Sequence, residues 1–162
     1  MLFLRYLHLL ALVIWLGGVV VAGAVVAPVT FGVLEAWNAV EGRVLAGQVF
    51  GAVLQRIHLG AYVLASVMIV TLSLQRLLGP RPVSYGVRVS LIGLMFAVTL
   101  GSGLLISPRV ATLQREVSGP IAALPSDDPR RAEFNRLHGL SNLLWSAVAA
   151  GGLVLLVWEA RE

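Results

Sequence analysis

Three polar side chains near the C-terminal end of the chain have the spacing of one helix face. Asn135, His138 and Asn142 stand at positions i, i+3 and i+7, at the beginning of an uncharged run that extends from Leu137 to Trp158. A helix points residues with this spacing in one direction, and polar groups of an apolar helix face a partner or a cavity rather than lipid. The pattern therefore predicts a binding site at one end of this run.

Further polar side chains are expected at the same level if the apolar runs cross a membrane in alternating directions. His58 begins the second run, and Arg109 ends the third. We call the predicted site the polar mouth, and it consists of Gln55, His58, Arg109, Asn135, His138, Ser141 and Asn142. Such a set would bind a lipid headgroup, another anion or a protein partner. The same groups also tie helices together by hydrogen bonds, and the sequence leaves both interpretations open.

A haem or metal site is the alternative for the histidines. His58 and His138 on facing helices can hold a b-type haem as its two axial ligands. For copper or zinc these two ligands make an incomplete site, because the chain has no cysteine and the helix faces concerned carry no carboxylate. His8 begins the first run, near the opposite membrane face, where no second ligand is evident. Ser141 beside His138 lacks an acid at membrane depth, so no catalysis is predicted.

The composition places these residues in a membrane protein. Apolar residues make up 58% of the 162 residues and charged residues only 12%, and the mean hydropathy is +0.88. Soluble domains carry about a quarter charged residues. The 12 basic residues are all arginines and lie at the ends of apolar runs rather than on one face. This distribution fits membrane topology and argues against nucleic acid as a partner.

Four uncharged runs are long enough to supply the roughly 20 helical residues that cross a bilayer. They cover about residues 6–27, 57–75, 89–108 and 137–158 of a single domain, 1–162. We predict an all-α integral membrane four-helix bundle in which helices 2 and 4 extend beyond one membrane face. No internal repeat is evident. An even number of spans puts both termini on one side, and the arginines of the short second loop favour a cytoplasmic location for them.

Local signals support the extended helices. Helical periodicity continues upstream of the second run from Glu41, and Asp128-Pro129 has the composition of an N-cap followed by proline at the first helical position. Pro28 predicts a kink in the first helix. Residues 78–82 contain a glycine and two prolines and predict a turn.

Several of these segments together resemble the transmembrane protein 205 family, which consists of four-helix membrane proteins with a domain-of-unknown-function label. The segments are His8 to Gly17, Pro28 with Phe31, Ala46-Gly47 before Phe50, Pro108-Arg109, and the run from Asp128 to Ser141. This resemblance implies four spans and no established reaction. The first helix alone also resembles the opening helix of copper-resistance membrane proteins of the CopD type, which implies haem or copper near His8.

Taken together, the patterns predict a non-catalytic integral membrane protein that acts as a homo-oligomer or as an accessory subunit of a larger membrane complex. Its expected partners are membrane lipid and other membrane subunits. The alternative is a redox or metal-handling protein that binds b-type haem or copper through His58 and His138, or through His8.

Overall fold

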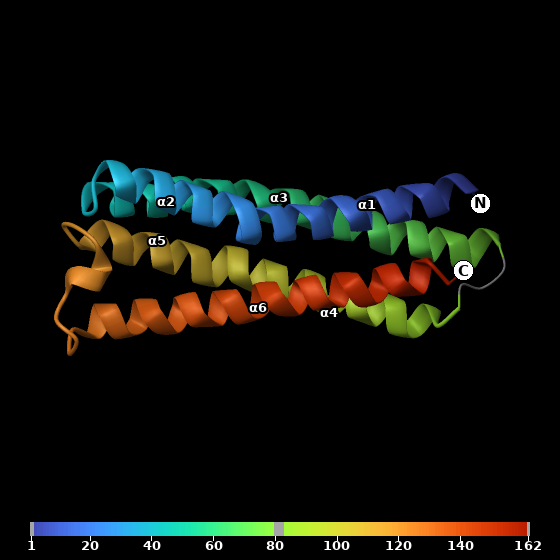
Figure 1. The fold of residues 1–162 in the computed structure, drawn as a ribbon. Coiled ribbons are helices and arrows are strands. Elements are labelled where there is room, and N and C mark those ends of the chain that lie inside the picture. Colours follow the sequence, from blue (N-terminus) through green and yellow to red (C-terminus); the bar gives the residue numbers. More distant parts are fainter. Residues whose placement is uncertain (1, 80–82, 162) are drawn as a thin grey trace.

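The computed structural model describes residues 2–79 and 83–161 and shows a bundle of long helices (Figure 1). The elements are α1 (Leu2–Val21), η1 (Ala22–Val26), α2 (Ala27–Trp37), α3 (Glu41–Leu78), α4 (Tyr85–Gly101), η2 (Ser102–Ile106), α5 (Ser107–Glu116), η3 (Ile121–Ala123) and α6 (Pro129–Glu159). No strand occurs among the described residues, and the all-α prediction is confirmed. Of the predicted turn over 78–82, residues 80–82 lie outside the described residues. The beginning of α1 and the end of α6 lie at the same end of the bundle.

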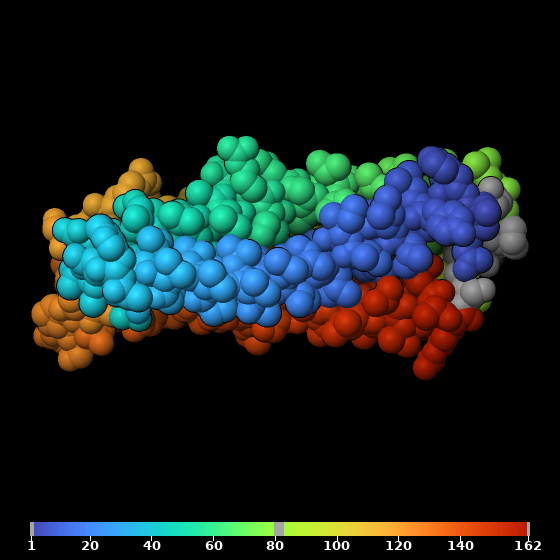
Figure 2. Space-filling view, turned by 45° about the horizontal axis from the view of Figure 1, so that its top comes forward, coloured from blue at the N-terminus to red at the C-terminus, as the bar shows by residue number. Residues whose placement is uncertain are grey.

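The chain forms four helical rods, each long and apolar enough to cross a membrane by length and composition. We therefore describe it as a multi-pass integral membrane protein. The rods have 36, 38, 32 and 31 residues, which at about 1.5 Å per residue gives about 46–57 Å, against a hydrocarbon core of about 30 Å. The second rod, α3, and the fourth rod, α6, are longer than a bilayer requires, as predicted for helices 2 and 4. The other two rods extend as well, because α2 continues α1 and α5 continues α4, and Figure 2 shows the first of these rods along the whole molecule.

Two π-helical turns interrupt the first and third rods. η1 and η2 each precede a proline that is the second residue of the next helix, Pro28 and Pro108. Proline has no N–H and its ring crowds the carbonyl four residues earlier, so a wider π turn gives the freed backbone groups room inside an apolar helix. The kink expected at Pro28 takes the form of a π turn in a continuous rod. Pro108 does not end the third helix, which continues to Glu116.

A polar side chain fixes the connection between α2 and α3. The Asn38 side-chain oxygen accepts hydrogen bonds from the backbone N–H groups of Val40 and Glu41, each at 2.9 Å. The helix beginning at Glu41 needs such a partner, because the first N–H groups of a helix have none within it. The predicted extension upstream of the second span is confirmed.

Asp128 performs the same task for α6. Its Oδ1 accepts a hydrogen bond from the backbone N–H of Arg130 at 2.8 Å, and Pro129 is the first residue of the helix, as predicted. The Arg130 guanidinium also donates to Oδ2 at 2.7 Å. These hydrogen bonds, together with the positive charge of Arg130, hold the pKa of the Asp128 carboxyl below its ordinary value.

The core of the bundle is apolar and receives side chains from all four rods. α1 and α4 each contact both α3 and α6. The buried apolar residues form one cluster of Ala11, Leu12, Trp15, Val19, Ala61, Ala65, Met68, Leu72, Ile92, Met95, Val148 and Leu155. Each rod buries one stripe in this core, and many leucines and valines on the other faces remain exposed, as a lipid-facing surface requires.

Candidate functional site

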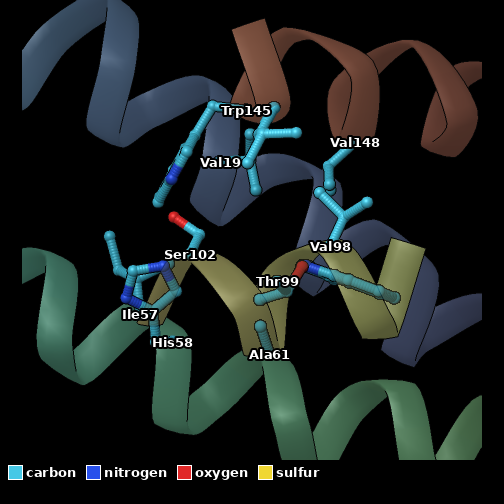
Figure 3. A pocket seen from close by; sticks show the side chains of 11 residues that line it. Val19, Ile57, His58, Ala61, Val98, Thr99, Ser102, Trp145 and Val148 are labelled. Carbon is cyan, nitrogen blue, oxygen red and sulfur yellow. The ribbon is translucent and has the colours of Figure 1, made fainter. Parts of the chain in front are cut away.

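His58 lies inside the bundle, where α3 faces η2 and α6. Its side chain is only 3% exposed. The imidazole is stacked with Tyr62 at a centroid distance of 6.4 Å and meets the ring of Trp145 edge-on at 5.8 Å. Figure 3 shows His58 on α3, Trp145 on α6 and Ser102 on η2 around one small space.

A small cavity, which we call the inner cavity, occupies that space. Its volume is about 10 Å³, enough for about one water molecule. Three buried polar atoms of its lining make no hydrogen bond within the described part of the chain, namely His58 Nε2, Trp15 Nε1 and Ser102 Oγ. The Thr99 hydroxyl, by contrast, donates to the Met95 carbonyl at 2.7 Å. The remaining lining residues are Val19, Ile57, Ala61, Val98, Leu144, Trp145 and Val148. An indole N–H, an imidazole nitrogen and a hydroxyl suffice to hold one water molecule.

Gly103 lets η2 approach α3 closely beside the inner cavity. A β carbon at this position would overlap the Tyr62 hydroxyl and would lie 3.0 Å from Cγ of His58. Gly23 holds the corresponding place in η1, and no atom lies within 4 Å of a β carbon built there. Of these two glycines, Gly103 in η2 allows a close approach of another helix, whereas Gly23 in η1 does not.

Four polar residues share one exposed stripe of α6. Asn135, His138 and Asn142 are all exposed, on the common face that their spacing predicts, and Ser146 is exposed one turn farther. We call these four residues the outer stripe. The His138 ring is stacked on Phe134 with a centroid distance of 5.8 Å and an interplanar angle of 4°.

The residues of the predicted polar mouth are divided between the interior and the surface. His58 points into the inner cavity, whereas His138 is exposed, so the two histidines do not share one environment. Gln55 is exposed on α3, and Ser141 is half-buried on α6. Of the seven predicted residues, the structure brings the three α6 residues of the outer stripe together, and it places the others elsewhere.

Arg109 is engaged with an acid. Its Nε and one terminal nitrogen donate to the two carboxylate oxygens of Glu133 at 2.6 and 2.7 Å, which joins α5 to α6 outside the uncharged runs. This bidentate hydrogen bond and the charge of Arg109 hold the pKa of the Glu133 carboxyl below its ordinary value and raise the pKa of Arg109. The guanidinium that we expected to bind an anion is thus already paired with an anionic side chain.

The structure also contains a polar cluster that sequence analysis missed. His8 is 1% exposed, and its Nδ1 lies 3.2 Å from both the Met68 carbonyl oxygen and the Thr71 hydroxyl oxygen. Its Nε2 lies 3.3 Å from Glu159 Oε1, and Arg88 forms an ion pair with the same oxygen. We call His8, Thr71, Arg88 and Glu159 the four-helix cluster, because α1, α3, α4 and α6 each supply one member.

This cluster corrects one expectation, because His8 does have a partner at its own depth. It also contains a buried acid, since the Glu159 side chain is only 8% exposed, but this acid lies at the opposite end of α6 from Ser141. Arg88 and Glu159 directly flank the uncharged runs 89–108 and 137–158. Charges in that position usually set topology. The sequence did contain a signal for this cluster. His8, Arg88 and Glu159 lie at the ends of the first, third and fourth uncharged runs, and these three ends are on the same side of the predicted bundle.

The histidines offer no shared position for a haem in this arrangement. Both ring nitrogens of His8 have partners, and Nε2 of His58 faces a cavity that holds about one water molecule. His138 is at the surface. Among the described residues, no three histidine, aspartate or glutamate side chains come together in a way that suits a metal ion.

A comparison with protein families gives one result. The model of a domain of unknown function, DUF4149, matches residues 10–118, which is more than half of the chain and includes both π turns. No curated protein and no solved structure matches the chain.

Proposed function

The chain belongs to the DUF4149 family, and from this starting point we propose that it is a non-catalytic membrane protein that acts as a homo-oligomer, with a second copy of the chain on the outer stripe of α6. On the motifs quoted above we also propose a relationship to the transmembrane protein 205 proteins. That relationship adds no reaction to the proposal.

The observation that carries the proposal is the position of Asn142. It lies inside the uncharged run of α6, it is exposed, and its side chain makes no hydrogen bond to the described residues. An amide without a partner in hydrocarbon costs about 2–7 kcal/mol, depending on the reference state. Another helix that supplies hydrogen bonds removes this cost. The lateral surface around Asn142 is therefore suited to a helix of another subunit.

A second copy is the partner that best fits the chemistry of the outer stripe. Asparagine carries both a donor and an acceptor, so Asn135 and Asn142 can pair with the same residues across a twofold axis. Gly139 and Ala150 are also exposed on α6, and small residues let two helices approach closely in lipid. A face that is complementary to itself needs no different subunit.

Cross-linking in the native membrane tests this interface directly. Because the chain has no cysteine, Ser146→Cys places a single thiol on the outer stripe with little change in size. We expect it to form a disulfide-linked dimer under mild oxidation. Val63→Cys is the matched control, because Val63 is 63% exposed within the second span but lies on α3, and we expect it to remain monomeric.

Asn142→Leu should then lower the dimer yield of Ser146→Cys, because it removes the interhelical hydrogen bonds. Equal cross-linking at positions 146 and 63 would contradict the proposal, and so would no effect of Asn142→Leu. A different protein that is captured at position 146 in stoichiometric amount would replace the homo-oligomer by the accessory-subunit alternative.

A further inference from the structure

The four-helix cluster lies where all four rods meet, at the end of the bundle where α1 begins and α6 ends. His8 and Arg88 are 1% and 2% exposed. Ionisable groups that face the interior of a membrane bundle are costly and usually serve a purpose beyond packing. The positions of the protons in this cluster follow from its hydrogen bonds.

The first step concerns Nδ1 of His8. Thr71 has a single hydroxyl proton, and its shortest hydrogen bond donates that proton to the Val67 carbonyl oxygen at 2.7 Å. The Met68 carbonyl oxygen is an acceptor only. Both groups within 3.2 Å of Nδ1 therefore accept, and Nδ1 must carry the proton that it donates to them.

The second step concerns Nε2 of His8. If Nδ1 carries the only ring proton, Nε2 has a lone pair and lies 3.3 Å from Glu159 Oε1, and two acceptors at this distance repel each other. One further proton between the imidazole and the carboxyl removes this conflict. Arg88 forms an ion pair with the same carboxylate oxygen and so stabilises the charged form of the carboxyl, which places the further proton on His8.

We propose that His8 and Glu159 form a proton-binding site inside the bundle, in which one exchangeable proton joins α1 to α6. Bound, the proton completes a charge-assisted hydrogen bond between Nε2–H and the carboxylate. When it is released to water, it leaves a neutral imidazole whose lone pair faces the carboxylate, and the contact between α1 and α6 becomes repulsive at this point.

A cleft between α1 and α6 borders the site at Glu159. The cleft has a volume of about 320 Å³ and is lined by Leu2, Arg5, Tyr6, Leu9, Leu156, Glu159 and Ala160. Glu159 is thus both the partner of His8 and part of the cleft wall. A proton that leaves Nε2 has a short exit beside Glu159, at the end of the bundle where α1 begins.

Each helix packed around the site contributes further polar or charged groups among the described residues. α4 contributes Arg88, and its Tyr85 lies under the guanidinium of Arg76 at 4.5 Å. α3 contributes Thr71 and also Gln75, which donates to the Leu4 carbonyl oxygen at 3.5 Å. Arg5 and Tyr6 of α1 line the cleft. Of these described groups, His8 and Glu159 are the pair that can share the further proton, because Nε2 lies 3.3 Å from Oε1.

Solid-state ¹⁵N NMR of the histidine-labelled protein in lipid bilayers tests the proposal, with the His8 signals assigned as those lost in His8→Asn. At neutral pH we expect both His8 nitrogens to be protonated, or Nδ1 protonated with Nε2 in a strong shared hydrogen bond. A spectrum with Nε2 protonated and Nδ1 bare overturns the proposal, and this spectrum is recorded on the parent protein, since His8→Asn serves only to assign the signals.

Glu159→Gln supplies the second test. The glutamine amide donates to Nε2, so we expect neutral His8 with its proton on Nδ1 and at least about a tenfold loss of affinity for the further proton, as expected for losing a charged hydrogen bond. Glu159→Asp, which keeps the charge, should retain part of that affinity. An unchanged affinity in Glu159→Gln would show that Glu159 does not hold the proton and would overturn the proposal.

Discussion

Gly103 allows a sharp test of the packing around the inner cavity. In Gly103→Ala the added β carbon would overlap the Tyr62 hydroxyl and lie 3.0 Å from Cγ of His58, so η2 or α3 must shift. Forcing one extra methyl group into a packed interior costs about 1–3 kcal/mol. Alanine also favours helix over glycine by up to about 1 kcal/mol, which partly offsets the cost.

Gly23→Ala isolates the packing cost, because Gly23 holds the same place in η1 and has nothing within 4 Å of the added carbon. Both variants gain the same helix propensity. We therefore expect Gly103→Ala to be less stable than Gly23→Ala by about 1–3 kcal/mol. The free energy of unfolding can be measured by circular dichroism in mixed micelles, as the fraction of a denaturing detergent is raised.

Tyr62→Phe identifies the atom responsible. It removes the hydroxyl that the new carbon would overlap, so the destabilisation by Gly103→Ala should be smaller in the Tyr62→Phe background than in the parent. The reasoning is refuted if Gly103→Ala and Gly23→Ala have equal stability, or if Tyr62→Phe leaves the cost of Gly103→Ala unchanged.

Two further predictions concern the cap of α6 and the histidines. The folded-state pKa of Asp128 is lowered, so the protection that its charge gives to the start of α6 is complete above the unfolded pKa of about 3.9 and is lost as the pH falls through the lower folded value. Protection of the Arg130 amide from hydrogen exchange, corrected for the intrinsic pH dependence, should fall in this acidic range in the parent. It should stay constant in Asp128→Asn, because the asparagine amide caps the helix without titrating. A parallel fall in the variant would contradict this assignment. For the purified protein we expect an optical spectrum without haem bands and a metal content below one ion per chain, because His8 is paired and His58 and His138 lie apart; a stoichiometric haem or metal that is lost in His58→Ala or His138→Ala would restore the redox alternative.

The architecture could be predicted because bilayer length and helix caps are local properties of the sequence. The uncharged runs, the cap at Asp128 and the helical extension from Glu41 needed only neighbouring residues. The extension of the first helix beyond Pro28, through Phe31 to Trp37, was expected, but that of the third helix beyond Pro108 was missed, because a π turn that accommodates a proline depends on the backbone of the whole rod.

The candidate sites were harder to predict because a membrane helix shows weak amphipathicity. In a soluble protein the apolar stripe of a helix identifies the inward face, but lipid makes the outer face equally apolar. His58 and His138 both follow an Arg-x pair at the start of a span, yet one is buried and the other exposed. The rotation of each helix decides between these outcomes, and it is set by close packing such as that at Gly103.

The matched π turns reveal a repeated plan in the bundle. Residue numbers in η2 exceed those in η1 by 80, and the same offset relates Gly23 to Gly103, Pro28 to Pro108 and Gln55-Arg56-Ile57-His58 to Asn135-Arg136-Leu137-His138. This constant offset corrects the expectation that the chain has no internal repeat, because each half consists of a helix with a π turn before a proline, followed by a second long helix. His8 and Arg88 are also 80 apart, and both contact Oε1 of Glu159, whose own counterpart is Gly79. Glu159 thus links the two halves at a position where the first half has a glycine, so the symmetry of the two halves is broken at the one acid that joins them.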